Sequence, residues 1–153
     1  MSLDLKDLHF AYGKRTVLEG VDTRWDTGQM VGLLGPNGAG KSTLVTCIAQ
    51  LRRYTGTVGF ADRTGRDLRE MIGYMPQGLP GDAALTALES VLTASRRGVA
   101  WHTSRADIDS AWGALDEIGV ADLADRPLGQ LSGGQRQLVA LAQTLVREPT
   151  LLL

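Results

Sequence analysis

The sequence predicts an α/β fold, and three features of the chain support this prediction. The apolar residues 30–34 lead into a glycine-rich loop at 35–43, and residues 41–50 have the composition of a helix. Upstream of this unit, polar and apolar residues alternate, which is typical of antiparallel strands. Downstream, residues 78–130 carry apolar residues at helical spacing. We therefore expect a core of strand, loop and helix, with an N-terminal antiparallel β-subdomain and a helical insertion.

Short alternating or apolar runs, bounded by turn residues, predict the strands in chain order. The run at 30–34 is uniformly apolar, so we expect it to be a buried strand that delivers the chain into the glycine-rich loop. The predicted strands are residues 3–10 (an edge strand), 16–18, 21–25, 30–34, 55–60, 72–75 and one beginning at 151, with turns at 12–15 and 26–28 and a polar connection at 63–69.

Spacing and capping residues predict the helices. Residues 84–97 are rich in helix formers, and Ser104 with Asp107 has the form of a capping box that would begin a second helix. A second glycine-rich loop at 131–135 opens a third helix, which Pro149 ends. The residues predicted to form the buried helix faces are Leu85, Leu88, Val91 and Leu92, then Ile108, Ala111, Trp112 and Leu115, and finally Leu138, Leu141, Ala142 and Leu145.

Length and composition narrow the class of protein. The 153 residues amount to about one domain, with predicted divisions at 1–77 (β-subdomain and loop core), 78–130 (helical subdomain) and 131–153 (second loop, helix and start of a strand). Lysine and arginine number 16 against 17 acidic residues, a balance that argues against a general nucleic-acid-binding surface. The single cysteine, Cys47, excludes an internal disulfide and is predicted to be a small buried apolar residue. We find no signal peptide and no bilayer-spanning stretch, so any role at a membrane would need a partner.

The loop at 35–43 has the pattern of a phosphate-binding loop, G-x-x-x-x-G-K-S-T, in its expected place between a strand and a helix. Glycine can adopt backbone conformations closed to other residues, so the chain can wrap around an anion with its N–H groups pointing inward. Lys41 supplies a full positive charge, and the Ser42 hydroxyl suits Mg²⁺. A plain strand-to-helix turn is the weaker alternative. The residues expected to hold a triphosphate are Gly35, Pro36, Asn37, Gly38, Ala39, Gly40, Lys41, Ser42 and Thr43.

Three further motifs accompany this loop. Residues 131–135 read Leu-Ser-Gly-Gly-Gln, residues 74–77 read Tyr-Met-Pro-Gln, and Tyr12 stands near the N-terminus at the start of the predicted turn. In this order they resemble the signature motif, the Q-loop and the A-loop of the ATP-binding subunit of ATP-binding-cassette (ABC) transporters. The resemblance covers nearly the whole chain and implies the ABC ATPase fold, built on a P-loop NTPase core.

The resemblance implies roles for the first two of these motifs. Tyr12 would stack on adenine, and the plainer alternative is an aromatic residue that covers the core. Gln77 would contact Mg²⁺ or the attacking water and relay the state of the site to a membrane partner, and the alternative is a polar residue after a turn proline. Lys41 and Gln77 would then be the catalytic residues, with Ser42 and Gln77 as the contacts to the metal.

The signature motif has a different implied role. In this family two subunits pack head to tail, so Ser132, Gly133, Gly134 and Gln135 would face the ATP of the second subunit. Amide groups at a helix N-terminus and a serine hydroxyl are chemically suited to a γ-phosphate. The alternative is an ordinary serine N-cap followed by glycines.

The resemblance further implies a function and its partners. The chain would be the ATP-binding, energy-coupling subunit of a transporter, with ATP and Mg²⁺ as cofactors. Its partners would be a second ABC subunit, a transmembrane permease and a substrate-binding protein. The permease would hold it in the cytoplasm at the inner face of the membrane. Residues 131–153 and 80–86 resemble importers of the iron-siderophore or cobalamin type. Transport specificity would lie in the permease and the binding protein, not in this site.

The family also has features that this sequence lacks. The strand that begins at 151 would continue into an Asp for Mg²⁺ and a Glu for the attacking water, with a switch histidine further on. We therefore expect the 153 residues to be a piece of a longer subunit that is catalytically incomplete alone. The alternatives are a soluble ABC protein of the translation-factor or repair type, a non-hydrolysing nucleotide-binding module, and, least favoured, a kinase.

Few other residues carry chemistry. His9 and His102 are expected at the surface without metal-ligand company, and neither matches the family's switch histidine. Arg96 and Arg97 are expected at a solvated helix end.

Overall fold

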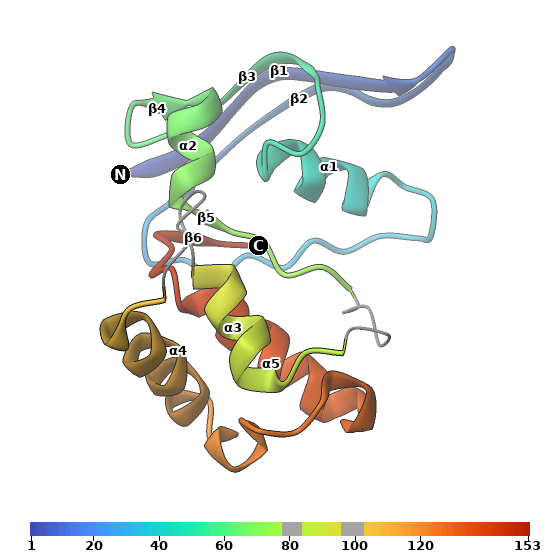
Figure 1. Ribbon diagram of the computed structural model, residues 1–153. Coiled ribbons are helices and arrows are strands. Elements are labelled where there is room, and N and C mark those ends of the chain that lie inside the picture. The colour runs from blue at the N-terminus through green and yellow to red at the C-terminus, as the bar shows by residue number, and fades with distance from the viewer. Residues whose placement is uncertain (78–83, 96–102) are drawn as a thin grey trace. The chain divides into compact units, whose positions relative to one another are not determined.

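The computed structural model describes residues 1–77, 84–95 and 103–153, and the chain folds into two compact units (Figure 1). The first comprises Met1–Ile72 with Leu153, and the second comprises Gly73–Leu152. The predictions for Arg96, Arg97 and His102 concern positions outside the described residues, as does the part of the importer resemblance at residues 80–83.

The first unit is built on an antiparallel sheet with the strand order β2-β1-β3-β4. Burial of alternate leucines on β1, Leu3 and Leu5, together with Leu8, anchors this sheet. The elements of the unit are β1 (Ser2–Tyr12), β2 (Arg15–Asp26), α1 (Lys41–Ile48), β3 (Thr55–Phe60), β4 (Arg63–Thr64) and α2 (Gly65–Met71).

The structure confirms the strand at 55–60 but corrects three expectations for the first unit. β1 is an interior strand, because both of its edges find partners, β2 and β3. The two segments predicted at 16–18 and 21–25 form one continuous strand, β2, which bends at Gly20 with a positive φ of 59°. The predicted polar connection contains β4 and α2 instead, because its lone leucine, Leu68, is fully buried and anchors the helix.

The apolar run at 30–34 is the largest departure from prediction. It forms no strand in this structure, and Met30 and Leu34 are 101% and 92% exposed. A strand exists only where a neighbour takes its backbone hydrogen bonds, and within the described part of the chain no strand pairs with these residues. The prediction of a buried strand is therefore wrong for this structure, although the run still leads into the loop at 35–40.

The second unit is mainly helical, and β5, which starts at the boundary residue Ile72, pairs with β6 in a short two-stranded sheet (Figure 1). The capping box predicted at Ser104 is present: its Oγ accepts from Asp107 N, and the Asp107 carboxylate accepts from Ser104 N. The elements are β5 (Ile72–Gly73), α3 (Ala87–Ser95), α4 (Arg105–Glu117), the 3-10 helices η1 (Ala121–Leu123) and η2 (Leu128–Gln130), α5 (Gly133–Leu145) and β6 (Leu151–Leu152).

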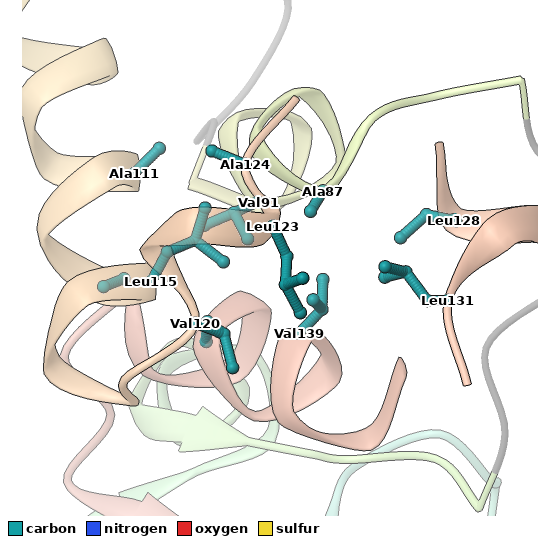
Figure 2. Packing of buried hydrophobic residues seen from close by; sticks show 12 residues of the cluster. Ala87, Val91, Ala111, Leu115, Val120, Leu123, Ala124, Leu128, Leu131 and Val139 are labelled. Carbon is teal, nitrogen blue, oxygen red and sulfur yellow. The ribbon is translucent and has the colours of Figure 1, made fainter. Parts of the chain in front are cut away.

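One hydrophobic cluster joins α3, α4 and α5, and Figure 2 shows its side chains converging between these helices. Small residues dominate the helix contacts, which lets the helices approach closely. The buried members are Ala87, Val91, Ala111, Ala114, Leu115, Val120, Leu123, Ala124, Leu128, Leu131, Val139 and Ala142.

The helix faces are only partly as predicted. On α4, Ala111 and Leu115 are buried as expected, but Ile108 and Trp112 are exposed. The reason is that Ala114 completes the buried stripe, and Trp112 lies about 100° round the helix from Ala111. On α5, Val139, Ala140, Ala142 and Thr144 are buried, whereas Leu138 is 41% exposed and Leu141 and Leu145 are half-buried. The prediction followed the leucines, whereas the buried face of α5 consists of smaller residues.

Gly56 marks a point where two backbones of the first unit touch. It has a φ of +90°, and a Cβ built there would lie 2.1 Å from the carbonyl oxygen of Asp7. Asp7 itself has a positive φ of 48°, in a stretch where β1 shifts register against both of its neighbours. This irregularity in β1 therefore requires glycine on the facing strand.

We predict that Gly56→Ala lowers the free energy of unfolding by at least about 2 kcal/mol, because it adds backbone strain to a steric clash. Urea denaturation of the full-length gene product measures the change. Gly59→Ala on the same strand is the matched control: its Cβ would meet Arg63 O at 3.5 Å, an ordinary contact, so the loss should stay below about 1 kcal/mol. Equal losses for both variants would contradict the contact with Asp7.

Candidate nucleotide-binding site

The glycine-rich loop closes around the start of α1. Gly35, Gly38 and Gly40 all have positive φ angles, of 155°, 84° and 90°. Gly40 is the N-cap of α1 in the left-handed conformation. A Cβ at Gly40 would lie 3.0 Å from Val17 Cγ1 and 3.2 Å from Val17 O. Glycine is thus required here twice, by the backbone angle and by the close approach of β2.

Lys41 is the first residue of α1, and its ammonium group folds back into the loop. Its Nζ donates hydrogen bonds to the carbonyl oxygens of Gly35 and Pro36, both at 2.7 Å. The first turn of α1 contains no acidic residue, so the ammonium charge adds to the positive end of the helix dipole. The loop therefore presents a concentrated positive potential to an anion.

The two hydroxyl residues after Lys41 have different environments. The Ser42 side chain is exposed, and no hydrogen bond to its hydroxyl is found among the described residues. Thr43 is 8% exposed and faces the interior. Of the pair, only Ser42 can reach a ligand from solvent.

The described residues suit Mg²⁺ only as an ion that bridges protein and nucleotide. No group of three or more His, Cys, Asp or Glu residues gathers within the described ranges. Mg²⁺ commonly keeps several waters and takes one or two protein ligands together with substrate phosphates. An accessible Ser42 hydroxyl beside a phosphate loop fits that pattern, and the ion would neutralise phosphate charge there.

Tyr12 is the last residue of β1 and is 48% exposed. Its ring contacts Phe10 edge to face, with 4.8 Å between the centroids. The guanidinium of Arg52 lies 5.5 Å from the centroid of the Tyr12 ring. Tyr12 therefore packs against neighbouring side chains, as the plainer alternative of a core-covering aromatic expects. About half of the residue nevertheless remains exposed and open to a ligand.

Gln77 lies in the second unit, four residues beyond the end of β5, and is exposed. It is the last described residue before positions 78–83. Its side chain is thus open to solvent, as the predicted role requires.

The second glycine-rich loop forms the N-terminus of α5 through a complete capping box. Ser132 Oγ accepts from Gln135 N at 3.2 Å, and Gln135 Oε1 accepts from Ser132 N at 2.9 Å. The N-cap alternative for Ser132 is therefore realised, yet its hydroxyl proton is still free to donate to an acceptor. Gly133 and Gly134 are exposed, and a Cβ at either would meet no atom within 4 Å. Packing among the described residues of the second unit gives no reason for glycine at these two positions.

Comparison with known proteins decides the family. The family model described as ABC transporter matches residues 18–153. The chain belongs to the ABC transporter family. Its fold is correspondingly that of the ABC ATPases: a nucleotide-free ATP-binding cassette from an ABC transporter superposes with a TM-score of 0.88 at 24% identity, covering 99% of this chain and 68% of that one.

Two curated relatives come from Bacillus subtilis (strain 168). The manganese transport system ATP-binding protein MntB is 36% identical over 148 residues, covering 94% of this chain and 59% of the relative. The high-affinity zinc uptake system ATP-binding protein ZnuC is 35% identical over 157 residues, covering 99% of this chain and 68% of the relative. The chain thus spans about three fifths of MntB. The expected iron-siderophore or cobalamin type is not confirmed, since these relatives are named for manganese and zinc.

His9 has a structural role in the first unit. His9 Nε2 lies 2.7 Å from Asp7 Oδ1, and its Nδ1 accepts from Gly20 N at 3.2 Å. The histidine therefore ties β1 to the bend in β2.

Within the described part of the chain, no helix is long and apolar enough to cross a membrane.

Sequence reasoning missed Arg52 as a neighbour of Tyr12. Forty residues separate the two positions, and neither spacing nor a motif connects them. Only the fold of the first unit brings them together.

Cys47 is fully buried on α1, and burial raises the pKa of its thiol above the ordinary value of 9.0, an effect that the nearby Arg52 charge partly opposes. A raised pKa in the folded state means that folding favours the neutral thiol. The thiol's contribution to stability is therefore complete below the unfolded-state pKa and is lost as pH rises through the folded-state pKa.

We predict that the free energy of unfolding falls as pH rises above about 9, with a slope from this thiol of up to about 1.4 kcal/mol per pH unit. Denaturant titrations of the wild-type protein and of Cys47→Ala between about pH 8 and 10 measure it. The variant should lack this component of the slope. Burial, with a smaller contribution from the Cys47 charge, also raises the pKa of Tyr54 above 10.0, so the contribution of Tyr54 begins at higher pH than that of the thiol. Parallel profiles would contradict the burial of Cys47 as the cause.

Proposed function

We propose that the chain is the ATP-binding part of an energy-coupling subunit of an ABC transporter. In the full-length, dimeric protein it would bind ATP with Mg²⁺ and hydrolyse it to drive transport by a partner permease. The observation that carries this proposal is the Lys41 ammonium held against Gly35 O and Pro36 O at the start of α1.

The residues of the loop would act together on a triphosphate. Backbone N–H groups of residues 35–43 would bind the β- and γ-phosphates, and Lys41 would exchange its carbonyl contacts for phosphate oxygens. Its charge would then offset the negative charge that develops as the γ-phosphoryl group transfers. Ser42 would hold the metal that bridges these phosphates. Tyr12 would stack on adenine, and Gln77 would orient the attacking water.

The glycines of the second loop support a head-to-tail dimer. Glycine in the first turn of a helix costs up to about 1 kcal/mol relative to alanine, and the packing of this chain gives no reason for Gly133 or Gly134. A ligand that comes close to the backbone from outside the chain would supply the reason. We propose that this ligand is the γ-phosphate of ATP on a second subunit, with Ser132 Oγ donating to it and Gln135 maintaining the cap.

The relatives support a metal importer as the transport system. MntB and ZnuC are named for manganese and zinc, so we propose a transition-metal ion, free or complexed, as the cargo of the permease. A substrate-binding protein would deliver it, and the subunit would lie in the cytoplasm at the inner face of the membrane.

We predict that Lys41→Ala weakens ATP binding by at least about tenfold, because the loop loses its only full positive charge at the phosphates. Isothermal titration calorimetry with Mg²⁺ and ATP on the full-length protein measures it. Lys6→Ala is the matched control, since Lys6 is an exposed lysine on β1 and should bind ATP like the wild type. Unchanged affinity in Lys41→Ala would overturn the proposed site.

A second prediction tests the dimer. Gly134→Glu places a carboxylate in the first turn of α5, where the helix dipole favours it, so the monomer should keep its stability. The same charge should repel the γ-phosphate of the facing subunit and abolish ATP-dependent dimerisation, measured by light scattering. Gly113→Glu on α4 is the control, because a Cβ there also meets open space. A dimer that survives Gly134→Glu would remove the signature loop from the interface.

A further inference from the structure

Arg52 lies beside the ring on which the nucleotide base is proposed to stack. Its Cζ is 5.5 Å from the Tyr12 centroid, inside the range of about 6 Å over which a cation is attracted to an aromatic face. Phe10 touches the same ring at 4.8 Å between centroids, with the planes at 83°. Tyr12 is thus held from two directions, by its own strand and by a residue that follows α1.

The backbone that carries Arg52 is fixed by the end of α1. Gln50 has a left-handed φ of 58°, its N–H donates to Cys47 O, and the N–H of Leu51 donates to Thr46 O, both at 3.0 Å. These two bonds form a Schellman motif, which usually has glycine at the left-handed position. Here glutamine takes that position, and its side chain pairs with the Tyr54 hydroxyl through both amide atoms, at 2.7 and 2.9 Å. Arg52 therefore leaves the helix in a defined direction.

The charge of Arg52 is directed at the ring. Among the described residues, no carboxylate forms an ion pair with Arg52. By contrast, Arg63, Arg66 and Arg105 each have one carboxylate partner and Arg24 has two. A planar guanidinium stacks on aromatic rings better than an ammonium does and is more weakly hydrated.

We propose that Arg52 is a positioning residue for the nucleotide base: its guanidinium covers one face of Tyr12 and leaves the other face to stack on adenine. This inference rests on the proposed function and adds a residue to it. A ring already held by Arg52 and Phe10 loses less conformational freedom when the base stacks on it. The arrangement also ties both ends of the nucleotide to one helix, with the phosphates at the N-terminus of α1 and the base platform at its C-terminal cap.

The test compares two ligands on the full-length protein. Isothermal titration calorimetry measures the affinity for ATP and for inorganic tripolyphosphate, each with Mg²⁺, in the wild type, Arg52→Ala, Arg52→Lys and Arg53→Ala. We expect Arg52→Ala to weaken ATP binding about two- to fivefold and to leave tripolyphosphate binding unchanged. Arg52→Lys should retain part of the effect. Arg53→Ala removes the neighbouring exposed arginine, so it reports the effect of net charge alone.

A double-mutant cycle separates positioning from a general effect on the fold. In a Tyr12→Ala background, Arg52→Ala should cause no further loss of ATP affinity. The inference is overturned if Arg52→Ala tightens ATP binding, because the base would then displace the guanidinium. Equal weakening for both ligands, or the same loss with and without Tyr12, also overturns it. If ATP affinity is unchanged in Arg52→Ala but clearly lower in Lys41→Ala, the role of Arg52 is rejected and the proposed nucleotide site stands. If ATP affinity is unchanged in both variants, the proposed nucleotide site itself is rejected.

Discussion

The contact between the Lys41 ammonium and two loop carbonyls is the constraint on which the nucleotide site depends. A charge can sit 2.7 Å from both Gly35 O and Pro36 O only if the loop turns back on itself within six residues. That turn needs the positive φ angles of Gly35, Gly38 and Gly40, and it needs β2 close enough to forbid a side chain at Gly40. The sheet of the first unit thus serves the site by fixing where α1 begins.

Sequence alone predicts those features whose causes are local. The capping box at Ser104 joins a side chain to a backbone group three residues away, and it occurs as predicted. The helix expected after the loop at 131–135 also forms, and its N-terminus has a capping box at Ser132 that was not predicted. The helix after the phosphate loop is likewise set by adjacent residues. The predictions that were wrong depended on partners distant in sequence. β1 is an interior strand because β3 pairs with it, and residues 30–34 form no strand because no described strand pairs with them. The buried face of α5 depended on the size of residues on neighbouring helices, which periodicity does not report.

The glycines divide into two groups that sequence cannot distinguish. At Gly40 and Gly56 the structure supplies the reason for glycine, since a Cβ would strike Val17 or Asp7. At Gly133 and Gly134 it supplies none, because the space around them is open. Gly133 and Gly134 lower the stability of the helix, and no packing contact among the described residues compensates for this. Such residues are typical of a functional site, which is consistent with the proposed ligand. The same comparison explains why Ser132 is informative: its cap satisfies the helix, and its exposure leaves the hydroxyl proton for an acceptor.

The position of Arg52 shows why a site predicted from motifs remains incomplete. A motif gives the residue that is proposed to touch the ligand, here Tyr12, but the orientation of that residue is decided by the side chains that pack against it. Glutamine in place of glycine at the Schellman position stiffens the turn, because it has fewer backbone states to lose and its amide is bound to Tyr54. A stiff turn holds Arg52 over the ring, and a held ring is a better platform than a mobile one. The proposed stacking of the base would therefore depend on the C-terminal cap of the helix whose N-terminus is proposed to bind the phosphates.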